Sequence, residues 1–194
     1  TTPSNYFHVL RRQMHREFRK PLIIMTPKSL LRHKRCVSSI SEFISKSSFH
    51  RVLEDDAYIK ENNLISLKKD NKIKKVVMCS GKIYYDLLEG RENYKRDDIT
   101  FVRLEQLYPF PAKTLAQILK KYKKAKFIWC QEEPKNMGAW NTVRNYIERT
   151  LEMINFKDIN IKFVGRSASS TTATGNANKH LAQQKEILEK ILKY

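Results

Sequence analysis

The sequence predicts an α/β fold in which a mainly parallel sheet carries helices on both faces. From about residue 72 onward, short apolar runs alternate four times with segments whose apolar residues recur at helical spacing. Such alternation is typical of βα units, whose strands lie parallel and whose helices cover the sheet. With 194 residues, 41% of them hydrophobic, the chain is long enough to bury a substantial core.

The N-terminal part predicts a helix, a strand and a second helix that cannot form a sheet alone. Thr2 is a typical N-cap before a proline, so we expect a helix that reaches Phe18 and packs its apolar face. Residues 22–25 are apolar and predict a short strand, and residues 26–33 (TPKSLLRH) predict a second helix. Because a lone strand leaves its edges unpaired, its partners are expected upstream or in another subunit.

Residues 45–71 predict a linker between two parts of the chain. Their composition is mixed, and a polar, lysine-rich run begins near their end. We therefore expect one domain to end within residues 1–44 and a second domain to occupy residues 72–194.

Each of the four βα units rests on an apolar strand followed by a helical pattern. The expected strands are 76–79, 99–104, 125–130 and 159–164. In the segments that follow, apolar residues recur three or four positions apart, which places them on one helix face. Those residues are Ile83, Leu87 and Leu88; Leu115, Ile118, Leu119 and Tyr122; Val143, Ile147 and Leu151; and Leu181, Leu188 and Leu192.

The basic composition invites a polyanionic partner, but the distribution of charge disfavours nucleic acid. The chain carries 38 lysine and arginine residues against 20 aspartate and glutamate residues, a net charge of +18. The basic residues occur in separate segments, 11–20, 68–75 and 120–126, and no nucleic-acid motif accompanies them. A basic polyanion-binding module stays an alternative function, which a salt-titrated DNA-binding assay tests.

The sequence predicts a protein of a reducing, aqueous compartment. No apolar run has the length that a membrane span needs, and the first residues lack the pattern of a signal peptide. The chain starts on a helix cap at Thr1, without methionine, so we expect it to come from a longer polypeptide. Cys36, Cys79 and Cys130 lack metal or redox spacing and are expected to be free thiols.

Polar residues follow the predicted strands at one edge of the sheet, where ligands of open α/β sheets bind. The motif WCQEEPKNMGAW ends one strand and opens the next helix, and it brings a glutamine and two glutamates to this edge. We expect a strand-end rim that faces Lys82 and Arg166, although glutamates here are also suited to be solvated or to cap the helix. Its members are Glu105, Gln131, Glu132 and Glu133.

The segment after the last strand, GRSASSTTATGNANKH, is a candidate regulatory anion site. An arginine, several hydroxyls and free amides before a helix suit a phosphate or a carboxylate. The expected residues are Arg166, Ser167, Ser169 and Lys82. A plain surface loop and an internal pair between Arg166 and a glutamate are the alternatives.

The sequence itself offers no catalytic, cofactor-binding or metal-binding residues. The SGK at 80–82 lacks the upstream glycines of a phosphate loop and predicts a tight turn. None of the five histidines has the spacing of a metal site, and no nucleophile or zinc motif occurs. These observations favour a binding or assembly domain over a complete active site.

Several motifs in order carry a family resemblance that covers nearly the whole chain. They are NYFHVLRRQ, REFRKPLIIMTPKSLLRH, FHRVL, CSGKIYYDL, RLEQLYPFP, WCQEEPKNMGAW, and a closing GR followed by ATG and His180. Together they resemble the C-terminal part of the thiamine-diphosphate-dependent 2-oxoglutarate dehydrogenases. The resemblance implies that residues 1–44 end a pyrimidine-binding α/β domain and that residues 72–194 form a transketolase-type C-terminal domain.

The resemblance also implies a parent enzyme whose active site lies elsewhere. Members decarboxylate 2-oxoglutarate on thiamine diphosphate with magnesium and pass the succinyl group to a lipoyl arm of the succinyltransferase component, in the citric acid cycle. The residues for this chemistry belong to segments upstream of Thr1, so the chain alone is expected to be inactive and to bind no cofactor. It is expected to serve homodimer contacts and regulation, in the bacterial cytoplasm or the mitochondrial matrix.

One departure from the family affects the candidate anion site. The closing loop of relatives carries prolines where this chain has Ser167 and Thr172, so the loop is expected to be more mobile. The β subunit of a related thiamine-dependent 2-oxo acid dehydrogenase is the alternative of the same fold, but it is expected to lack RKPLIIMTPKSLLRH.

Overall fold

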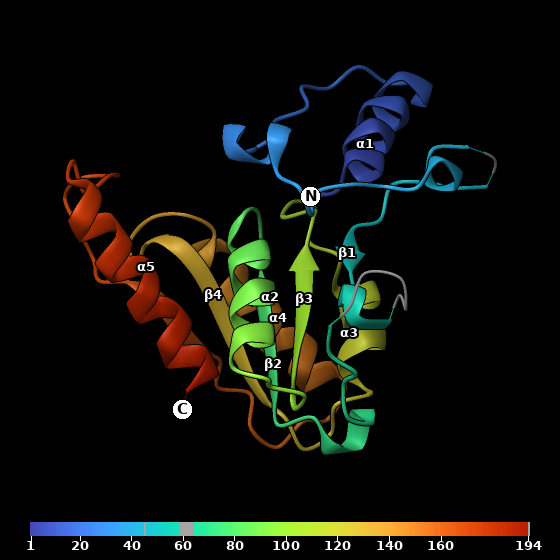
Figure 1. Cartoon of the computed structure of the whole chain (residues 1–194). Helices are drawn as coiled ribbons and strands as arrows, with labels where there is room; N and C mark the ends of the chain where they lie inside the picture. Colours follow the sequence, from blue (N-terminus) through green and yellow to red (C-terminus); the bar gives the residue numbers. More distant parts are fainter. Residues whose placement is uncertain (45, 59–63, 194) are drawn as a thin grey trace.

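The computed structural model describes residues 1–44, 46–58 and 64–193 and shows a five-stranded sheet (Figure 1). The strand order is β1-β3-β2-β4-β5, and every neighbouring pair is parallel except β1 with β3. The predicted α/β class with a mainly parallel sheet is confirmed. The strands are β1 (Val52–Leu53), β2 (Lys75–Cys79), β3 (Ile99–Leu104), β4 (Lys126–Pro134) and β5 (Lys162–Arg166).

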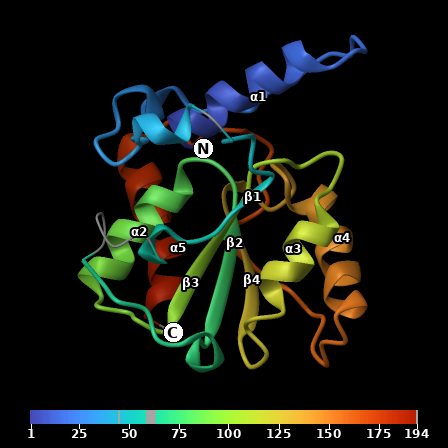
Figure 2. The same cartoon turned by 90° about the vertical axis from the view of Figure 1, so that its right-hand side faces the viewer.

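Helices cover both faces of this sheet, with α2 and α5 on one side and α3 and α4 on the other (Figure 2). Val77 and Cys79 of β2 pack toward α2 and α5, whereas Val76 and Met78 pack toward α3 and α4. Successive side chains of a strand point to opposite faces, so a strand covered on both sides is apolar throughout. The helices are α2 (Ile83–Asn93), α3 (Ala112–Leu119), α4 (Trp140–Met153) and α5 (Ala177–Leu192).

Three strands differ from the limits that their local sequence predicts, β2 by one residue and β4 and β5 by more. β4 continues beyond Cys130, because an irregularity after that residue lets Pro134 pair with Arg166 of β5. β5 begins at Lys162, three residues after the predicted start. Ile159 lies in the preceding loop and still packs against the core.

The N-terminal helix contacts the rest of the protein through polar residues. α1 (Pro3–His15) is capped as predicted, since Thr2 Oγ1 accepts a hydrogen bond of 3.2 Å from the Asn5 backbone N–H. The predicted extension to Phe18 is wrong, and so is the predicted burial of the apolar face, because Met14 is 75% exposed. The buried residues of α1 are Ser4, Asn5, His8 and Val9.

The predicted strand at 22–25 is wrong, because these residues form no strand in the structure. They have no strand partner among the described residues, and Ile23 and Met25 are 82% and 83% exposed. The predicted second helix is a short 3₁₀ helix, η1 (Lys28–Arg32). This part of the chain and α1 lie beyond the carboxyl ends of the strands (Figure 1).

Part of the predicted linker contributes to the sheet. Val52 and Leu53 pair with the end of β3. Short 3₁₀ helices precede and follow this segment in the sequence, namely η2 (Ile40–Glu42), η3 (Asp56–Tyr58) and η5 (Asp70–Lys72). Asp55 is buried and ion-pairs with Arg91 of α2. The division of the chain at 45–71 stays a prediction, and residues 45 and 59–63 lie outside the described part of the chain.

Hydrogen exchange should show that α1 opens before β4. α1 leaves most of its apolar side chains exposed, whereas residues 127–130 of β4 are buried between two neighbouring strands. Local opening costs least where few apolar contacts break, so the amides of residues 6–15 are expected to exchange first. Native-state exchange followed by mass spectrometry measures the order, and the reverse order would contradict this difference in stability.

Candidate functional site

The strand-end rim predicted from the sequence lies at the carboxyl end of the sheet, but its members contact different parts of the protein. The carboxylate of Glu105 accepts a hydrogen bond of 3.2 Å from Asn5 Nδ2 of α1, and its side chain is 5% exposed. Asn5 also binds the backbone of His50 in both directions. Glu105 therefore holds the N-terminal segment on the sheet, and no contact joins it to Lys82 or Arg166.

Lys82 and Arg166 belong to one hydrogen-bonded network that links the two ends of the predicted anion site. Lys82 Nζ lies 2.6 Å from Asp86 Oδ2 and 3.4 Å from Glu132 Oε1. Gln184 Nε2 donates to the same Asp86 oxygen at 2.7 Å, and its Oε1 accepts from Arg166 Nη2 at 3.4 Å. The network therefore ties α2, β4, β5 and α5 together at the rim.

The charge of Lys82 is stabilised inside this network. Burial of the ammonium group opposes its charge, but hydrogen bonds and attraction from Asp86 and Glu132 outweigh burial and raise the pKa of Lys82. The positive charge of a lysine held by two carboxylates is already neutralised, so its attraction for an added anion is weaker than that of an unpaired lysine.

The side-chain partners of Arg166 are a histidine and a glutamine. Its Nη2 lies 3.0 Å from His180 Nδ1 in addition to the contact with Gln184, and no carboxylate lies within 4.0 Å of it in the described ranges. Its Nε is buried without a hydrogen-bond partner among those residues. The alternative of an internal pair with a glutamate is therefore absent from the described contacts.

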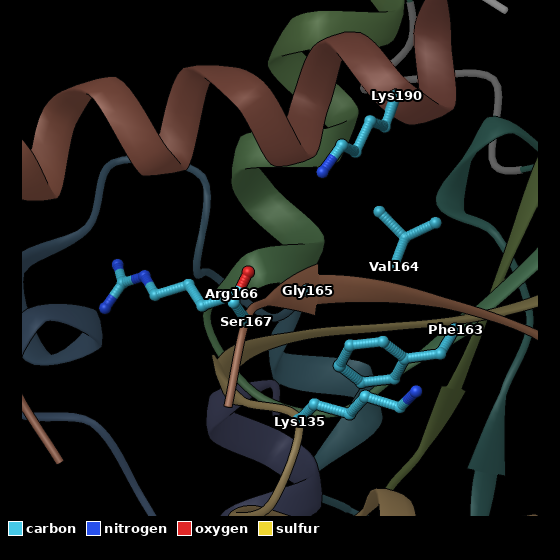
Figure 3. Close-up of a pocket in the computed structure, with 7 residues that line it drawn as sticks. All are labelled: Lys135, Phe163, Val164, Gly165, Arg166, Ser167 and Lys190. Carbon is cyan, nitrogen blue, oxygen red and sulfur yellow. The ribbon is translucent and has the colours of Figure 1, made fainter. Parts of the chain in front are cut away.

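A hollow of about 180 Å³ adjoins Arg166 at the end of β5. Figure 3 shows that the guanidinium of Arg166 points away from the amino groups of Lys135 and Lys190. The three cations therefore do not converge on one point. The hydroxyl of Ser169 lies 3.3 Å from that of Thr171, outside the lining of the hollow, which consists of Lys135, Phe163, Val164, Gly165, Arg166, Ser167 and Lys190.

Gln131 organises the WCQEEPKNMGAW motif from inside the protein. Its side chain is buried, and its Oε1 accepts hydrogen bonds from Trp129 Nε1 at 2.9 Å and from the Trp140 backbone N–H at 3.0 Å. Its Nε2 donates to the carbonyl of Met137 at 2.7 Å. Gly138 has φ +68°, and a Cβ there would lie 3.0 Å from Gln131 Nε2. Gln131 is thus a structural residue of the turn. Of the two glutamates that follow it, Glu132 is half-buried and Glu133 is exposed.

Some residues of this region had a local signal in the sequence and others had none. Asp86 follows Lys82 by four positions on the start of a helix, the spacing of a helical ion pair. His180 and Gln184 lie on α5, fourteen and eighteen residues after Arg166, and both contact its guanidinium. No feature of the sequence around them predicts this contact.

Two kinds of feature, a metal-binding cluster and a membrane-spanning helix, are not found among the described residues. No three histidine, cysteine, aspartate or glutamate side chains among them gather closely enough to hold a metal ion. No helix in that part of the chain is both long and apolar enough to cross a membrane. The contacts described above join the N-terminal segment, α2, β4, β5 and α5 at this edge of the sheet.

Cys79 and Cys130 should resist labelling in the folded protein. They are fully buried neighbours on β2 and β4, and burial raises the pKa of the Cys79 thiol to about 12 and raises that of Cys130 as well. Iodoacetamide followed by mass spectrometry should therefore modify Cys36 first and the other two only after denaturation. Because the folded pKa of Cys79 is raised, its contribution to stability is present below the unfolded thiol pKa and is lost as the pH rises from there toward 12. Early labelling of either buried thiol would contradict this.

Comparisons with known proteins place the chain beside one group of relatives. Residues 37–192 match the family model described as 2-oxoglutarate dehydrogenase C-terminal. A protein of Brucella anthropi, named 2-oxoglutarate dehydrogenase E1 component, is 56% identical over 192 residues, which cover 99% of this chain and 19% of the relative. A protein of the same name from Brucella ovis is 55% identical over the same shares. The chain thus spans about a fifth of the length of these curated relatives.

Proposed function

The chain belongs to the 2-oxoglutarate dehydrogenase C-terminal family, and we propose that it is the C-terminal part of an enzyme that decarboxylates 2-oxoglutarate and passes the succinyl group to a lipoyl arm of the succinyltransferase component. The observation that carries this proposal is the identity of 55–56% to E1 components across 99% of the chain. We place the parent enzyme in the citric acid cycle, in the bacterial cytoplasm or the mitochondrial matrix.

Thiamine diphosphate and magnesium belong, in this proposal, to other parts of the parent. The carbanion chemistry is supplied by the cofactor, which the protein must bind through a metal and its diphosphate. Among the described residues no three histidine, cysteine, aspartate or glutamate side chains are grouped so that they could hold a metal ion, which supports placing the metal elsewhere in the parent. No step of the reaction is assigned to this chain, and calorimetry with thiamine diphosphate and magnesium should detect no tight binding to it.

The role of the chain itself is assembly of the parent enzyme, as a homodimer. The support is the apolar surface of residues 1–44, where large side chains remain exposed without a covering element among the described residues. Exposed apolar surface of this kind is typical of a contact with another protein part. Its most exposed members are Met14, Ile23, Met25, Leu31 and Ile40.

A chimeric enzyme tests the proposed function. The C-terminal segment of the Brucella anthropi relative that aligns with this chain is replaced by the chain, and 2-oxoglutarate-dependent reduction of a small electron acceptor is measured. We expect activity and a dimer, whereas the relative truncated at the same point should lose both. A soluble, folded chimera without activity would refute the assignment.

Arg166 is the residue through which we propose regulation by a phosphate- or carboxylate-bearing effector. Its guanidinium contacts His180 and Gln184 and pairs with no carboxylate among the described residues, and a charge-assisted hydrogen bond contributes about 1.5–3 kcal/mol. In the full-length enzyme, Arg166→Ala is therefore expected to weaken binding of pyrophosphate about 10-fold or more, with an unchanged melting temperature.

The matched control for this prediction is Arg149→Ala, because Arg149 is exposed on α4 and away from the hollow. Pyrophosphate affinity should be unaffected by the control. A lower melting temperature with unchanged pyrophosphate affinity in Arg166→Ala would show that Arg166 only holds α5 on the sheet.

A further inference from the structure

The structure gathers lysines from separate segments at the amino ends of the strands. The loops that precede β2, β4 and β5 lie together at the end of the sheet opposite α1 (Figure 1 and Figure 2). Parallel strands start at the same edge, so basic segments that are distant in the sequence become neighbours there. The amino-end lysines, as we name them, are Lys72, Lys123, Lys124, Lys126, Lys157 and Lys162.

The backbone contacts bring these loops close to one another. The Lys126 N–H donates to the carbonyl of Lys74 at 2.8 Å, and Lys162 pairs with Ile128 of β4. The pKa of the neighbouring Lys75 is lowered, first by burial and then by Arg96, with further repulsion from Lys162 and Lys126. Positive charge therefore accumulates at this edge.

Internal ion pairs do not neutralise the amino-end lysines. All six are exposed, and none forms an ion pair within residues 1–44, 46–58 and 64–193. Two of the nearby carboxylates have other partners, because Asp97 pairs with Lys68 and Asp98 pairs with Lys74 and Arg96. Two of the basic segments that are separate in the sequence, 68–75 and 120–126, therefore meet in space, whereas segment 11–20 lies at the other end of the sheet (Figure 1).

Helix dipoles account for only part of this charge. The carboxyl ends of α2, α3 and α4 point toward the same edge, and cations within the last turn of a helix are stabilised there. Lys126 and Lys162 are instead the first residues of β4 and β5, and Lys72 ends η5, so none of the three lies in the last turn of an α-helix. Because these lysines are exposed and lie at one edge, they can bind an acidic partner outside the described residues.

We propose that the amino-end lysines form a docking surface for the acidic surface of another protein, which they attract and hold transiently. Lysine is depleted in the cores of tight interfaces, so the contact is weak and acts mainly on the rate of association. The exposed Asp158, and Asp97 at 45% exposure, interrupt the patch, which suits a protein surface of mixed charge better than a uniform layer of phosphates.

Two side chains near the amino-end lysines, Arg96 and Tyr122, make contacts inside the protein and are not free to bind nucleic acid. The Arg96 guanidinium is bound to Asp98 and to the carbonyl of Leu192, so this guanidinium is not free to contact a base or a phosphate. The ring of Tyr122, which lies between two of the lysine positions in sequence, is 1% exposed and cannot stack on a base.

Charge removal in the full-length protein that carries this chain tests the proposal. The test variant is Lys124→Gln/Lys126→Gln/Lys162→Gln, and the control Lys113→Gln/Lys179→Gln/Lys185→Gln removes three exposed lysines from α3 and α5. A fluorescent polyglutamate peptide is the probe, and association is followed by stopped-flow anisotropy at low and near-physiological salt. We expect association with the test variant to slow at least about 10-fold at low salt, and the control to behave as the unmodified protein.

Three results would overturn the proposal. If association with polyglutamate slowed equally in both variants, the rate would depend on the net charge of the protein and not on this surface. Tighter binding of a DNA duplex than of polyglutamate, abolished in the test variant, would assign the surface to nucleic acid. The same result with phosphatidylglycerol vesicles would assign it to a membrane. Melting temperatures of both variants establish that the proteins compared are folded.

Discussion

Replacing Arg91 with methionine is expected to destabilise the protein by about 3–5 kcal/mol, because it leaves a buried carboxylate without its counter-charge. Arg91 and Asp55 are 1% and 0% exposed at their side chains, and both guanidinium nitrogens Nη1 and Nη2 donate to Asp55. The same carboxylate accepts from the Phe101 backbone N–H at 2.8 Å. The pair therefore joins α2 to β3 and to the segment that follows β1, and urea unfolding of the chain measures its loss.

The matched control is Arg144→Met. The Arg144 side chain is 53% exposed and pairs with Glu148 one turn further along α4, an arrangement expected to contribute less than about 0.5 kcal/mol. Adding Asp55→Asn to Arg91→Met should recover part of the loss, since it removes the buried charge. If Arg91→Met and Arg144→Met lowered the free energy of unfolding by similarly small amounts, burial would not be what makes the pair between Arg91 and Asp55 important.

Gln131→Met is expected to cost about 2–4 kcal/mol, because it leaves two buried donors without an acceptor. Those donors are the indole N–H of Trp129 and the backbone N–H of Trp140, which both bind Gln131 Oε1. Methionine keeps the volume of the side chain, so the loss reports mainly on hydrogen bonding. The chain contains two tryptophans, and both contact Gln131, so the fluorescence of the native state should change together with the unfolding midpoint.

Gln117→Met on the exposed side of α3 is the control, and surface substitutions of this kind are expected to change stability by less than about 0.5 kcal/mol. If Gln131→Met proved as mild as the control, with unchanged fluorescence, Gln131 would not be the organising residue of the turn.

The regular part of the fold was predictable because its signals are local. β3 has the limits that its apolar run predicts, and Thr2 caps α1 as its side chain and the following proline indicate. β4 was underestimated because Glu132 and Glu133 resemble a solvated loop, and pairing with β5 decides that they extend the strand. The strand predicted at 22–25 failed for the converse reason, since its residues have strand propensity but no partner in the described structure.

The candidate site was predictable only as a location. The carboxyl ends of the strands do collect Lys82, Arg166 and the glutamates, but Glu105 binds Asn5 of α1 and Arg166 binds Gln184 of α5, which their local sequence does not indicate. Spacing could place Asp86 beside Lys82, whereas no spacing could place Gln184 between Asp86 and Arg166.

Sequence alone is sufficient for the class of the fold, the order of its βα units and the family, since propensity, periodicity and motifs depend on neighbouring residues. Burial and charge depend on what distant segments bring to a point in space. Only the tertiary structure therefore decides that Arg91 and Gln131 lie in the interior, that Met14 and Ile23 remain exposed, and that the amino-end lysines form one surface. The physical reason is that desolvation and electrostatic potential sum over everything nearby, whatever its position in the chain.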